Sequence, residues 1–453
     1  MSQLGKYEYT NSLHADGHRR ILYPSEVRGG FQKLKKIIHP LMILNFLVLP
    51  LLRIGDDRLL LIDIQHRTFF IFGFSFNAQD IYLMFFLVTG LAFTLFFITA
   101  LVGRIFCGWA CPQTVFLEGI YRRVERWIEG SQANYFKNRS KKNATYWRNM
   151  GLKYIAYILI SFLLAHFIVL YFVRLHVYQE MWLGNVSSHP VVFAWIMFLT
   201  FLLTFNYGWF REQLCLVICP YGRLQSVLMD DDSLLIGYDP NRGEPRGKLK
   251  DPNRGQCIDC NRCVEVCPTG IDIRNGMQME CIGCANCIDA CDEIMLKIGQ
   301  PKGLVRYDSY NGLTQQKKTI LRPRIYVYMV LLAIGAIVST KMISKRTSFE
   351  ANLLRAKGAP YLLLEKTIRN QYEIHLFNKD RFDRTFTIKP IPIDGVRFTI
   401  PIQKLTIKKL RDQTVPVFVE MDKDRFEKSF DIEVLIQHEN GEKIMETVVF
   451  TGP

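Results

Sequence analysis

The amino-acid sequence predicts a multi-domain membrane protein with an all-α transmembrane bundle, a cysteine-rich α+β insert and a C-terminal all-β domain. Three patterns carry this prediction: five apolar segments of nearly membrane-spanning length, eight cysteines in two evenly spaced runs, and alternating apolar residues in 342–453. The chain has 453 residues, which at roughly 100 to 200 residues per domain corresponds to two to four domains.

Composition excludes several classes of protein. The chain is 49% hydrophobic with a mean hydropathy of +0.07, so strongly apolar stretches alternate with polar ones, unlike a disordered or fibrous chain. We attribute the net charge of +15 to basic loops on the cytoplasmic side of a membrane, and we expect no nucleic-acid partner. All 12 cysteines lie between Cys107 and Cys291 in short clusters, which indicates metal or redox chemistry rather than a disulfide scaffold.

Five segments approach the roughly 20 apolar residues that cross a bilayer. They are 37–54, 80–102, 151–173, 191–210 and 325–341. The first and last are the weakest. Asn45 and Pro50 interrupt the first, and the last needs the flanking Arg324 and Lys341, which can snorkel. A buried core helix is the alternative for these two segments.

Lys and Arg predict the orientation, because these residues resist translocation across the membrane. They concentrate in 1–36, 103–150 and 211–324, so we expect a multi-pass protein of the bacterial inner membrane with these regions in the cytoplasm. The polar residues 1–36 also lack the apolar core of a signal peptide. The expected domains are a cytoplasmic N-terminal segment (1–36), a four-helix membrane region (37–230), a cytoplasmic insert (231–324), a fifth transmembrane helix (325–341) and a periplasmic domain (342–453).

Eight cysteines match the spacing of bacterial two-cluster ferredoxins. The runs are Cys257-x2-Cys260-x2-Cys263-x3-Cys267-Pro268 and Cys281-x2-Cys284-x2-Cys287-x3-Cys291. Three closely spaced thiolates hold three corners of a cubane, and the fourth ligand comes from the other run. We therefore expect a ferredoxin-like insert with one 4Fe-4S cluster on Cys257, Cys260, Cys263 and Cys291 and the other on Cys281, Cys284, Cys287 and Cys267. A zinc site is the alternative, but this spacing matches cubanes more closely.

The other four cysteines form two C-x3-C-P motifs, Cys107-Gly-Trp-Ala-Cys111-Pro112 and Cys215-Leu-Val-Ile-Cys219-Pro220. Each motif follows an even-numbered apolar segment, so 37–129 and 151–230 form a predicted repeat with four thiols at one membrane face. If each C-x3-C is helical, its two thiols share a face, and the proline begins a further helix, 113–129 in the first copy. Cys111 and Cys219 would then cap helix N-termini, where a thiol's pKa is lowered. The alternative is small buried hydrophobes in the bundle.

The histidines and the C-terminal region give weaker indications of function than the cysteines do. His166 alone lies deep in a membrane segment, so a bis-histidine haem is not expected. His176 and His189 lie in or beside a short external loop, where they are interfacial polar residues or ligands for Cu(II).

Alternating segments such as 372–377 and 430–436 predict six or seven strands of an immunoglobulin-like sandwich, a fold that more often docks partners than performs chemistry.

The complete arrangement resembles the cytochrome c oxidase accessory proteins of the CcoG/FixG/RdxA family along essentially the whole chain. The ferredoxin motif is shared by many redox proteins and the C-x3-C-P unit by the NapH and NosR quinol-linked families, but only this family adds the C-terminal domain. The resemblance implies a cupric reductase that supplies Cu(I) for the copper centre of cbb-type oxidases. It also implies membrane lipid, copper ions, copper chaperones and oxidase assembly factors as partners.

The chemistry is consistent with that implied function, because Cu(II) prefers nitrogen and oxygen ligands whereas Cu(I) prefers thiolates. Our hypothesis is that an unidentified cytoplasmic donor reduces the clusters and that electrons reach copper at the catalytic cysteines, which are Cys107, Cys111, Cys215 and Cys219. Two alternatives remain open, a NapH-like quinol dehydrogenase and a non-enzymatic scaffold for oxidase assembly. The oligomeric state is also open, with a homodimer among the options.

Overall fold

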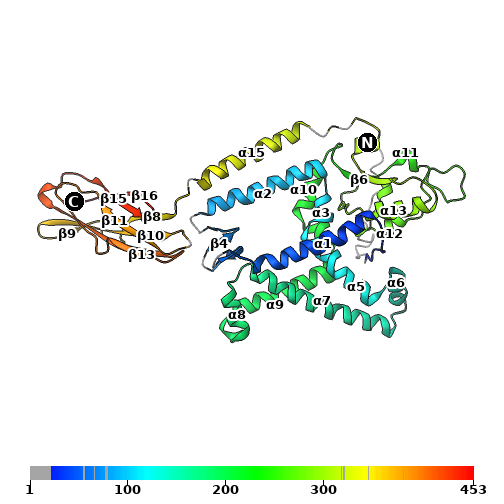
Figure 1. Ribbon diagram of the computed structural model, residues 1–453, viewed down its shortest axis with the longest axis horizontal. Helices are drawn as coiled ribbons and strands as arrows, with labels where there is room; N and C mark the ends of the chain where they lie inside the picture. The colour runs from blue at the N-terminus through cyan, green and yellow to red at the C-terminus, as the bar shows by residue number, and fades with distance from the viewer. Residues whose placement is uncertain are drawn as a thin grey trace. The chain divides into compact units, whose positions relative to one another are not determined.

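The computed structural model describes most of the chain (Figure 1). The first 21 positions of the predicted segment 1–36 lie outside the described residues, which are 22–54, 57–65, 67–76, 80–184, 186–317, 319, 322–344, 346–380 and 382–453. The chain divides into two compact units. One comprises Met1–Asp63 with Phe86–Ile337, and the other comprises Ile64–Phe85 with Val338–Pro453.

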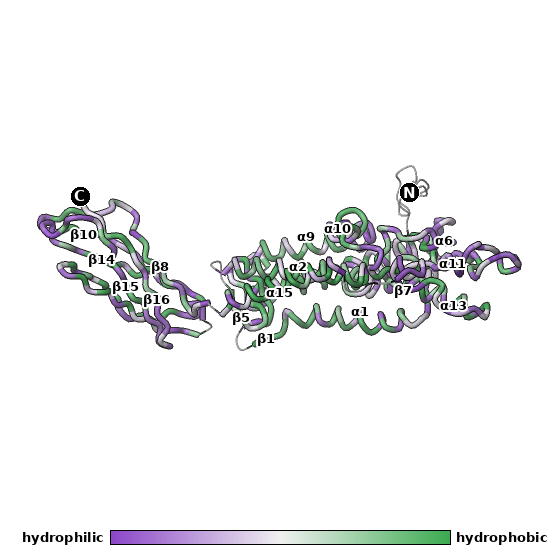
Figure 2. Tube along the Cα trace, turned by 90° about the horizontal axis from the view of Figure 1, so that it is seen from above, coloured by the Kyte–Doolittle hydropathy of each residue, from purple (hydrophilic) through white to green (hydrophobic). Residues whose placement is uncertain are grey.

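Within the described residues, five helices are long and apolar enough to cross a membrane, as the sequence predicts. They lie within α1 (Gly30–Val48, continued by η2, Leu49–Leu51), α2 (Ile81–Val102), α7 (Ala144–Leu170), α9 (Pro190–Phe205, continued by η6, Asn206–Phe210) and α15 (Pro323–Ser344). Figure 2 shows hydrophobic residues along α1, α2, α9 and α15. Both α1 and α7 begin before the predicted starts at 37 and 151, since each opens with polar turns that precede its apolar run. The Asn143 side chain caps α7 by accepting the backbone N–H of Tyr146.

The core of the membrane bundle lies between α7 and α9, which pack side by side (Figure 1). Buried Ala165, Val169 and Ile196 fill one end of this contact together with Met181 of α8 (Leu175–Leu183). At the other end, the Tyr121 ring stacks on Tyr207 with centroids 4.4 Å apart and meets Tyr157 edge-on at 5.0 Å. The short helical turn η5 (Val186–Ser188) precedes α9.

Each even-numbered span leads into a broken helical path that carries a C-x3-C-P motif. The first path comprises α3 (Ile105–Trp109), α4 (Pro112–Phe116), the π-helical turn η4 (Leu117–Tyr121) and α5 (Arg122–Glu129), and α6 (Gln132–Lys141) follows it. The second comprises the π-helical turns η6 and η7 (Leu214–Ile218) and α10 (Pro220–Leu228). The predicted helix 113–129 is therefore interrupted by a π turn. Neither C-x3-C is one helix, because Cys111 and Cys219 have extended backbones, with ψ of 127° and 109°.

The cysteine-rich insert is α+β, as expected. Its strands β6 (Leu235–Tyr238) and β7 (Val305–Asp308) pair antiparallel, and both cysteine runs lie between them in the sequence. The helical elements of this region are α11 (Pro240–Gly243), α12 (Arg262–Glu265), η8 (Ile273–Asn275), α13 (Asn286–Lys297) and α14 (Tyr310–Leu313). Buried Ile236, Ile273, Met295 and Leu304 form a small core that also includes cysteine side chains. The insert therefore packs around its cysteines rather than around a large apolar centre.

The second unit contains an immunoglobulin-like sandwich with more strands than the six or seven predicted. Its sheets have the orders β12-β14-β10-β8, with β9 also on β10, and β13-β11-β15-β16. The bounds are β8 (Phe349–Arg355), β9 (Leu362–Leu363), β10 (Thr367–Asn378), β11 (Arg384–Pro390), β12 (Val396–Thr399), β13 (Lys404–Ile407), β14 (Asp412–Asp422), β15 (Phe430–His438) and β16 (Lys443–Phe450), with η9 (Lys423–Arg425) after β14. Strands as short as β9 and β13 leave too few residues for visible alternation.

The loop between the first two spans contributes to the second unit. Here β4 (Thr68–Ile71) and β5 (Phe74–Phe76) form a hairpin, and the side chain of Asp80 beyond it is fully buried. The Asp80 carboxylate forms ion pairs with Lys379 at 3.2 Å and Arg346 at 2.9 Å, both from the sandwich part of this unit. This attachment was not predicted. The remaining short strands are β1 (Arg53–Ile54), β2 (Asp57–Arg58) and β3 (Leu60–Asp63).

Candidate functional site

The eight cysteines of the two runs line two adjoining cavities. One cavity is lined by Cys257, Cys260, Cys263 and Cys291. The other is lined by Cys267, Cys281, Cys284 and Cys287, with Cys263 shared between them. Each cavity therefore combines cysteines from both runs.

Matching backbone turns place the two runs around these cavities. Asn261 and Ala285 occupy equivalent positions, between the second and third cysteine of each run, and have left-handed backbones with φ of 55° and 60°. Each residue directly precedes a helix, α12 or α13, so the chain reverses beside the thiols. Left-handed conformations cost free energy in residues other than glycine, so the surrounding structure must hold them.

The chemistry of these thiols fits an iron–sulfur cluster. Burial raises the pKa of both Cys263 and Cys281 to about 12, so a thiolate without a bound metal is disfavoured there. Metal coordination deprotonates thiols and balances their charge. In the described part of the chain, no three His, Cys, Asp or Glu side chains converge at the spacing of a single ion. The thiols instead surround a space, as the corners of a cubane require.

The four membrane-edge thiols, Cys107, Cys111, Cys215 and Cys219, form a second group. Cys107 lies in α3 and Cys215 in η7, whereas Cys111 and Cys219 are the N-cap residues of α4 and α10. Burial and, to a lesser extent, the three other thiols of the group together raise the pKa of Cys215 to about 12. The two motifs, more than 100 positions apart in the sequence, thus bring their sulfur atoms into one electrostatic neighbourhood.

Gln225 of the second motif's helix reaches the first thiol of the other motif. Its Nε2 donates to Sγ of Cys107 at 3.3 Å, and its side chain is fully buried. Burial raises the pKa of Cys107 to about 11 even though this hydrogen bond lowers it. The contact fixes one thiol of the group by a residue from the other repeat.

The pKa of Cys111 is raised overall, against the lowered pKa that its position at a helix N-terminus predicts. The backbone N–H groups of Gln113 and Thr114 do lower it, as a helix N-terminus should. Burial has the larger effect, and the pKa of Cys111 is raised overall.

Polar contacts between the two repeats match each other. Gln113, directly after the proline of the first motif, exchanges hydrogen bonds with Asn206, at 2.8 Å and 3.3 Å. Tyr221, directly after the proline of the second motif, shares a hydrogen bond of 2.7 Å with Thr99. Each motif is thereby attached to the end of the other repeat's span, which supports the predicted internal repeat.

The first motif also lies against the cysteine loop of the insert. A Cβ atom on Gly108 would lie 2.7 Å from the Cα of Cys284 and 2.7 Å from the carbonyl oxygen of Ile282. A Cβ on Gly283 would lie 2.9 Å from the carbonyl oxygen of Arg104. The two backbones thus meet through two glycines, next to Cys107 on one side and Cys284 on the other.

Side chains reinforce this contact. Arg104 donates to the carbonyl oxygen of Cys281 at 3.4 Å and also to that of Gly222 in the second motif. The indole N–H of Trp109 donates to the hydroxyl of Tyr307 at 3.0 Å, and that hydroxyl donates to the carbonyl oxygen of Gly283 at 2.6 Å. The cavity lined by Cys284 and the membrane-edge thiols therefore belong to one continuous structure.

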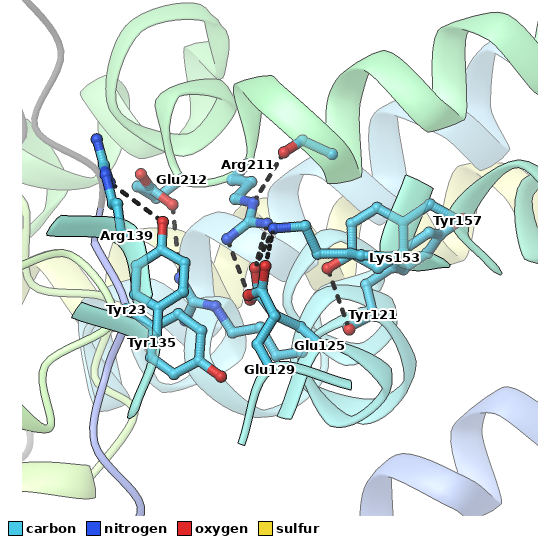
Figure 3. A network of polar contacts seen from close by, with 12 residues as sticks. Tyr23, Tyr121, Glu125, Glu129, Tyr135, Arg139, Lys153, Tyr157, Arg211 and Glu212 are labelled. Carbon is cyan, nitrogen blue, oxygen red and sulfur yellow. Dashed lines mark hydrogen bonds and ion pairs between the residues drawn. The ribbon is translucent and has the colours of Figure 1, made fainter. Parts of the chain in front are cut away.

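A buried ion network holds the same end of the bundle (Figure 3). Glu125 of α5 accepts hydrogen bonds from both terminal nitrogens of Arg211, at 2.7 Å and 3.2 Å. Lys153 of α7 donates a hydrogen bond to Glu129 at 2.7 Å. Burial alone would raise the pKa of Glu125, but Arg211 and Lys153 lower it below its ordinary value. Arg211 ends η6 shortly before Cys215, so the network fixes the approach to the second motif.

The histidines considered from sequence stay apart from these thiols. The Nδ1 of His166 lies 2.7 Å from the carbonyl oxygen of Phe162 in its own helix, and the ring packs on Trp182. His189 pairs with Glu180 at 3.4 Å, and among the described residues neither His189 nor His176 belongs to a group of three metal-ligating side chains. His166 is thus a satisfied residue of the bundle.

Three family models match the chain. Residues 210–310 match a 4Fe-4S dicluster domain, residues 83–130 match a 4Fe-4S binding domain, and residues 340–453 match an IG-like fold at the C-terminus of FixG. The second match contains Cys107 and Cys111, and the first contains Cys215 and Cys219 together with the eight ferredoxin cysteines.

Protein RdxB of Cereibacter sphaeroides is 34% identical over 405 residues, which cover 84% of this chain and 83% of that protein. The chain belongs to the FixG/RdxA family. Protein RdxA of the same organism is also 34% identical, over 84% of each chain. Nitrogen fixation protein FixG of Rhizobium meliloti is 29% identical over 90% of this chain and 88% of its own. This member of the FixG/RdxA family is therefore an iron–sulfur electron-transfer protein of a membrane.

Proposed function

We propose that this FixG/RdxA protein reduces Cu(II) to Cu(I) at its four membrane-edge thiols and supplies the product for assembly of a cbb-type cytochrome c oxidase. The observation that carries the proposal is the backbone contact between Gly108 and Cys284. It joins a group of soft sulfur ligands to the wall of an iron–sulfur cavity, as a protein that passes electrons to a thiophilic ion requires.

The residues of the insert divide into two ligand sets in this proposal. Each set holds one 4Fe-4S cluster, Cys257, Cys260, Cys263 and Cys291 in one and Cys281, Cys284, Cys287 and Cys267 in the other. When bound, the clusters supply electrons one at a time. Arg104, Trp109 and Tyr307 keep the first C-x3-C-P motif against the second cavity. These three side chains position the path and do not react.

The four membrane-edge cysteines perform the chemistry on the substrate ion. One electron converts one Cu(II) to Cu(I), and the thiolates favour the reduced ion over the oxidised one. Because burial raises the pKa of Cys107 and Cys215, copper binding must displace their protons to water. The thiols therefore stay protonated and unreactive until an ion arrives.

The same proposal assigns sides and partners. The basic regions around 103–150 and 211–324 support a cytoplasmic location for the insert and a periplasmic location for the sandwich in a bacterial inner membrane. Copper chaperones and oxidase assembly factors would receive the ion, and the sandwich would dock them, as immunoglobulin-like domains commonly do.

The test uses the full-length protein, purified anaerobically, reduced with dithionite and freed of reductant. Cu(II) is added in small increments while cluster absorbance and Cu(I), trapped by a colorimetric chelator, are measured together. We expect one Cu(I) for each electron lost from the clusters. Clusters that stay reduced beside unreacted Cu(II) would refute the reductase.

A cysteine variant locates the reaction. Replacing Cys107, Cys111, Cys215 and Cys219 by serine should abolish copper reduction while the iron and sulfide content stays that of the wild type. Unchanged copper reduction would rule out these thiols as the site. Oxidase assembly that persists after loss of all eight ferredoxin cysteines would favour a scaffold instead.

A further inference from the structure

The two ferredoxin cavities differ in their exposure. We call the one lined by Cys257, Cys260, Cys263 and Cys291 the outer cavity, and the one lined by Cys267, Cys281, Cys284 and Cys287 the inner cavity. Cys260 is exposed, whereas the other seven ferredoxin cysteines, all within the described residues, are buried or half-buried. The inner cavity adjoins the first C-x3-C-P motif through Cys284 and Gly108. A soluble molecule therefore reaches the outer cavity, and the membrane-edge thiols lie beside the inner one.

A basic loop, 245–254, packs against the outer cavity. The backbone N–H of Gly247 donates to the carbonyl oxygen of Cys257 at 3.3 Å, so the loop rests on a residue of the cavity wall. The two ends of the loop are joined, because the N–H of Gly255 donates to the carbonyl oxygen of Pro245 at 2.8 Å. The loop therefore has a defined position beside the outer cavity.

The positive charge of this loop is not balanced within it. Its basic residues are Arg246, Lys248, Lys250 and Arg254, and its acidic residue is Asp251. Arg246 pairs with Glu244, next to the loop, at 3.1 Å. Lys248 and Lys250 are exposed and form no ion pair within the part of the chain that the structure describes. Two ammonium groups are therefore available to carboxylates of another molecule.

An apolar side chain lies between the two lysines. Leu249 is 56% exposed, so the loop presents a small apolar centre flanked by positive charge. Protein interfaces commonly combine an apolar centre with a polar rim. Phospholipid and nucleic acid also attract basic loops, but neither exchanges electrons, and this loop lies beside an iron–sulfur cavity.

We propose that loop 245–254 is the docking surface for a small acidic protein that carries one electron at a time and exchanges it at the outer cavity. Opposite charges guide such encounters and set the orientation of the two proteins. The inference deepens the proposed function by naming the class of its electron donor. It rests on that function only for the direction in which the electrons flow.

The step is the transfer of one electron. The reduced carrier docks with its carboxylates on Lys248 and Lys250, and it is oxidised by one electron while the iron–sulfur side of the protein is reduced by one. No bond forms or breaks, and no proton is transferred. The carrier then leaves, because contacts of this kind are weakened readily by salt and turn over quickly.

The first test measures binding without electron transfer. The probe is an oxidised plant-type [2Fe–2S] ferredoxin with an acidic surface, titrated by calorimetry at low salt into full-length protein in phosphatidylcholine nanodiscs. We expect one ferredoxin per chain and an affinity that falls as salt is added, because salt screens the charges. Lys248→Glu combined with Lys250→Glu should weaken binding about tenfold.

A second charge reversal is the matched control. Lys137→Glu combined with Lys141→Glu makes the same change of charge at two exposed residues of α6, which contributes no residue to either ferredoxin cavity. This variant should bind ferredoxin as the wild type does. An equal loss in both variants would show that only the net charge of the protein matters, and it would overturn the inference.

A zero-length cross-link locates the contact. Carbodiimide joins a lysine amine directly to a carboxylate that touches it, so the bound complex is treated with carbodiimide and digested for mass spectrometry. We expect the cross-linked peptide of this protein to contain Lys248 or Lys250, and we expect added salt to prevent the cross-link. Cross-links confined to other lysines would place the carrier elsewhere.

The third test measures electron entry by stopped-flow absorbance under anaerobic conditions. Reduced ferredoxin should reduce the variant with Lys248→Glu and Lys250→Glu about tenfold more slowly than the wild type at low salt. Reduced methyl viologen, a small cation, should reduce this variant at the wild-type rate or faster. The dithionite-reduced variant should still reduce Cu(II) as the wild type does, so failure of this inference is distinguishable from failure of the copper reaction.

Three further outcomes would overturn the inference. The first is the absence of ferredoxin binding to the wild type. The second is an equal slowing of methyl viologen and ferredoxin in the variant, which would mean that the loop supports the cluster site rather than a partner. The third is loss of ferredoxin binding when phosphatidylglycerol is added to the nanodiscs, which would mean that the loop lies on anionic lipid.

Discussion

The carboxylate of Asp289 accepts a hydrogen bond from the backbone N–H of Gln32 at 2.8 Å. Its other oxygen accepts the N–H of Phe31 at 3.2 Å, so one side chain between Cys287 and Cys291 caps the first membrane helix. The N-cap residue of α1 is Gly29, which has no side chain to cap the helix, and a Cβ there would lie 2.1 Å from the Asp289 carboxyl carbon. The insert therefore fixes where the first span begins.

Asp289→Ala should loosen the start of α1. Loss of the cap removes two acceptors at a helix N-terminus, which typically costs about 1 kcal/mol. Hydrogen exchange of the amides of Phe31 and Gln32 should become faster while exchange in α7 stays the same. Asp289→Asn keeps an acceptor oxygen and serves as the control. Equal protection in Asp289→Ala and the wild type would show that the cap does not hold the helix.

Gly108→Ala should separate the first C-x3-C-P motif from the cysteine loop. The new methyl group would lie 2.7 Å from the Cα of Cys284, so one backbone has to move. We expect slower copper reduction with unchanged iron content, measured by stopped-flow absorbance. Gly90→Ala is the matched control, because nothing lies within 4 Å of a Cβ at that position. A wild-type rate in Gly108→Ala would mean that electrons take another route.

Lys35→Met should make the cluster beside Cys284 harder to reduce. A buried cation favours the reduced cluster, because reduction adds negative charge. The midpoint potential should become more negative by on the order of tens of millivolts, measured by redox titration with electron paramagnetic resonance. Lys33→Met changes the same charge on an exposed part of α1 and should leave the potential unchanged. Equal shifts in the two variants would argue against a local effect.

Arg211→Met should destabilise the membrane unit by about 3 kcal/mol, because it leaves Glu125 buried without its main partner. The double variant Glu125→Gln with Arg211→Met should recover much of this loss. Since the folded-state pKa of Glu125 is lowered, its contribution is complete above the ordinary carboxyl pKa of about 4.3 and is lost as the pH falls below it. Thermal unfolding in detergent between neutral and acid pH measures both effects. A pH-independent difference between wild type and Arg211→Met would contradict the pKa direction.

The parts that the sequence predicts well depend on local patterns. The five spans follow from runs of apolar residues, and the grouping of Cys267 with Cys281 rather than with Cys257 follows from spacing alone. The sandwich follows from alternation in long strands such as β10 and β15. In each case the deciding residues lie close together in the sequence.

The parts that could not be predicted depend on contacts between distant segments. The residues around Gly108 in the sequence do not predict that the loop of Cys284 packs against it. Likewise, the sequence around Gln225 does not distinguish it from other polar helix residues, although its side chain binds Cys107. The predicted direction for the pKa of Cys111 is wrong, because a helix N-terminus is visible in the sequence whereas the burial of the thiol is not. A charged residue such as Arg211 at the end of a span was a possible signal for the ion network.

The meeting of Gly108 with Cys284 also sets an order for biogenesis. The first motif is synthesised well before the second ferredoxin run, so its contact surface on the loop of Cys284 is formed only later. That surface takes its shape around the ferredoxin cysteines, and the same segment, through Asp289, supplies the cap of the first span. The first motif and the start of the first span therefore reach their final packing only after the second ferredoxin run has been synthesised and has folded against them.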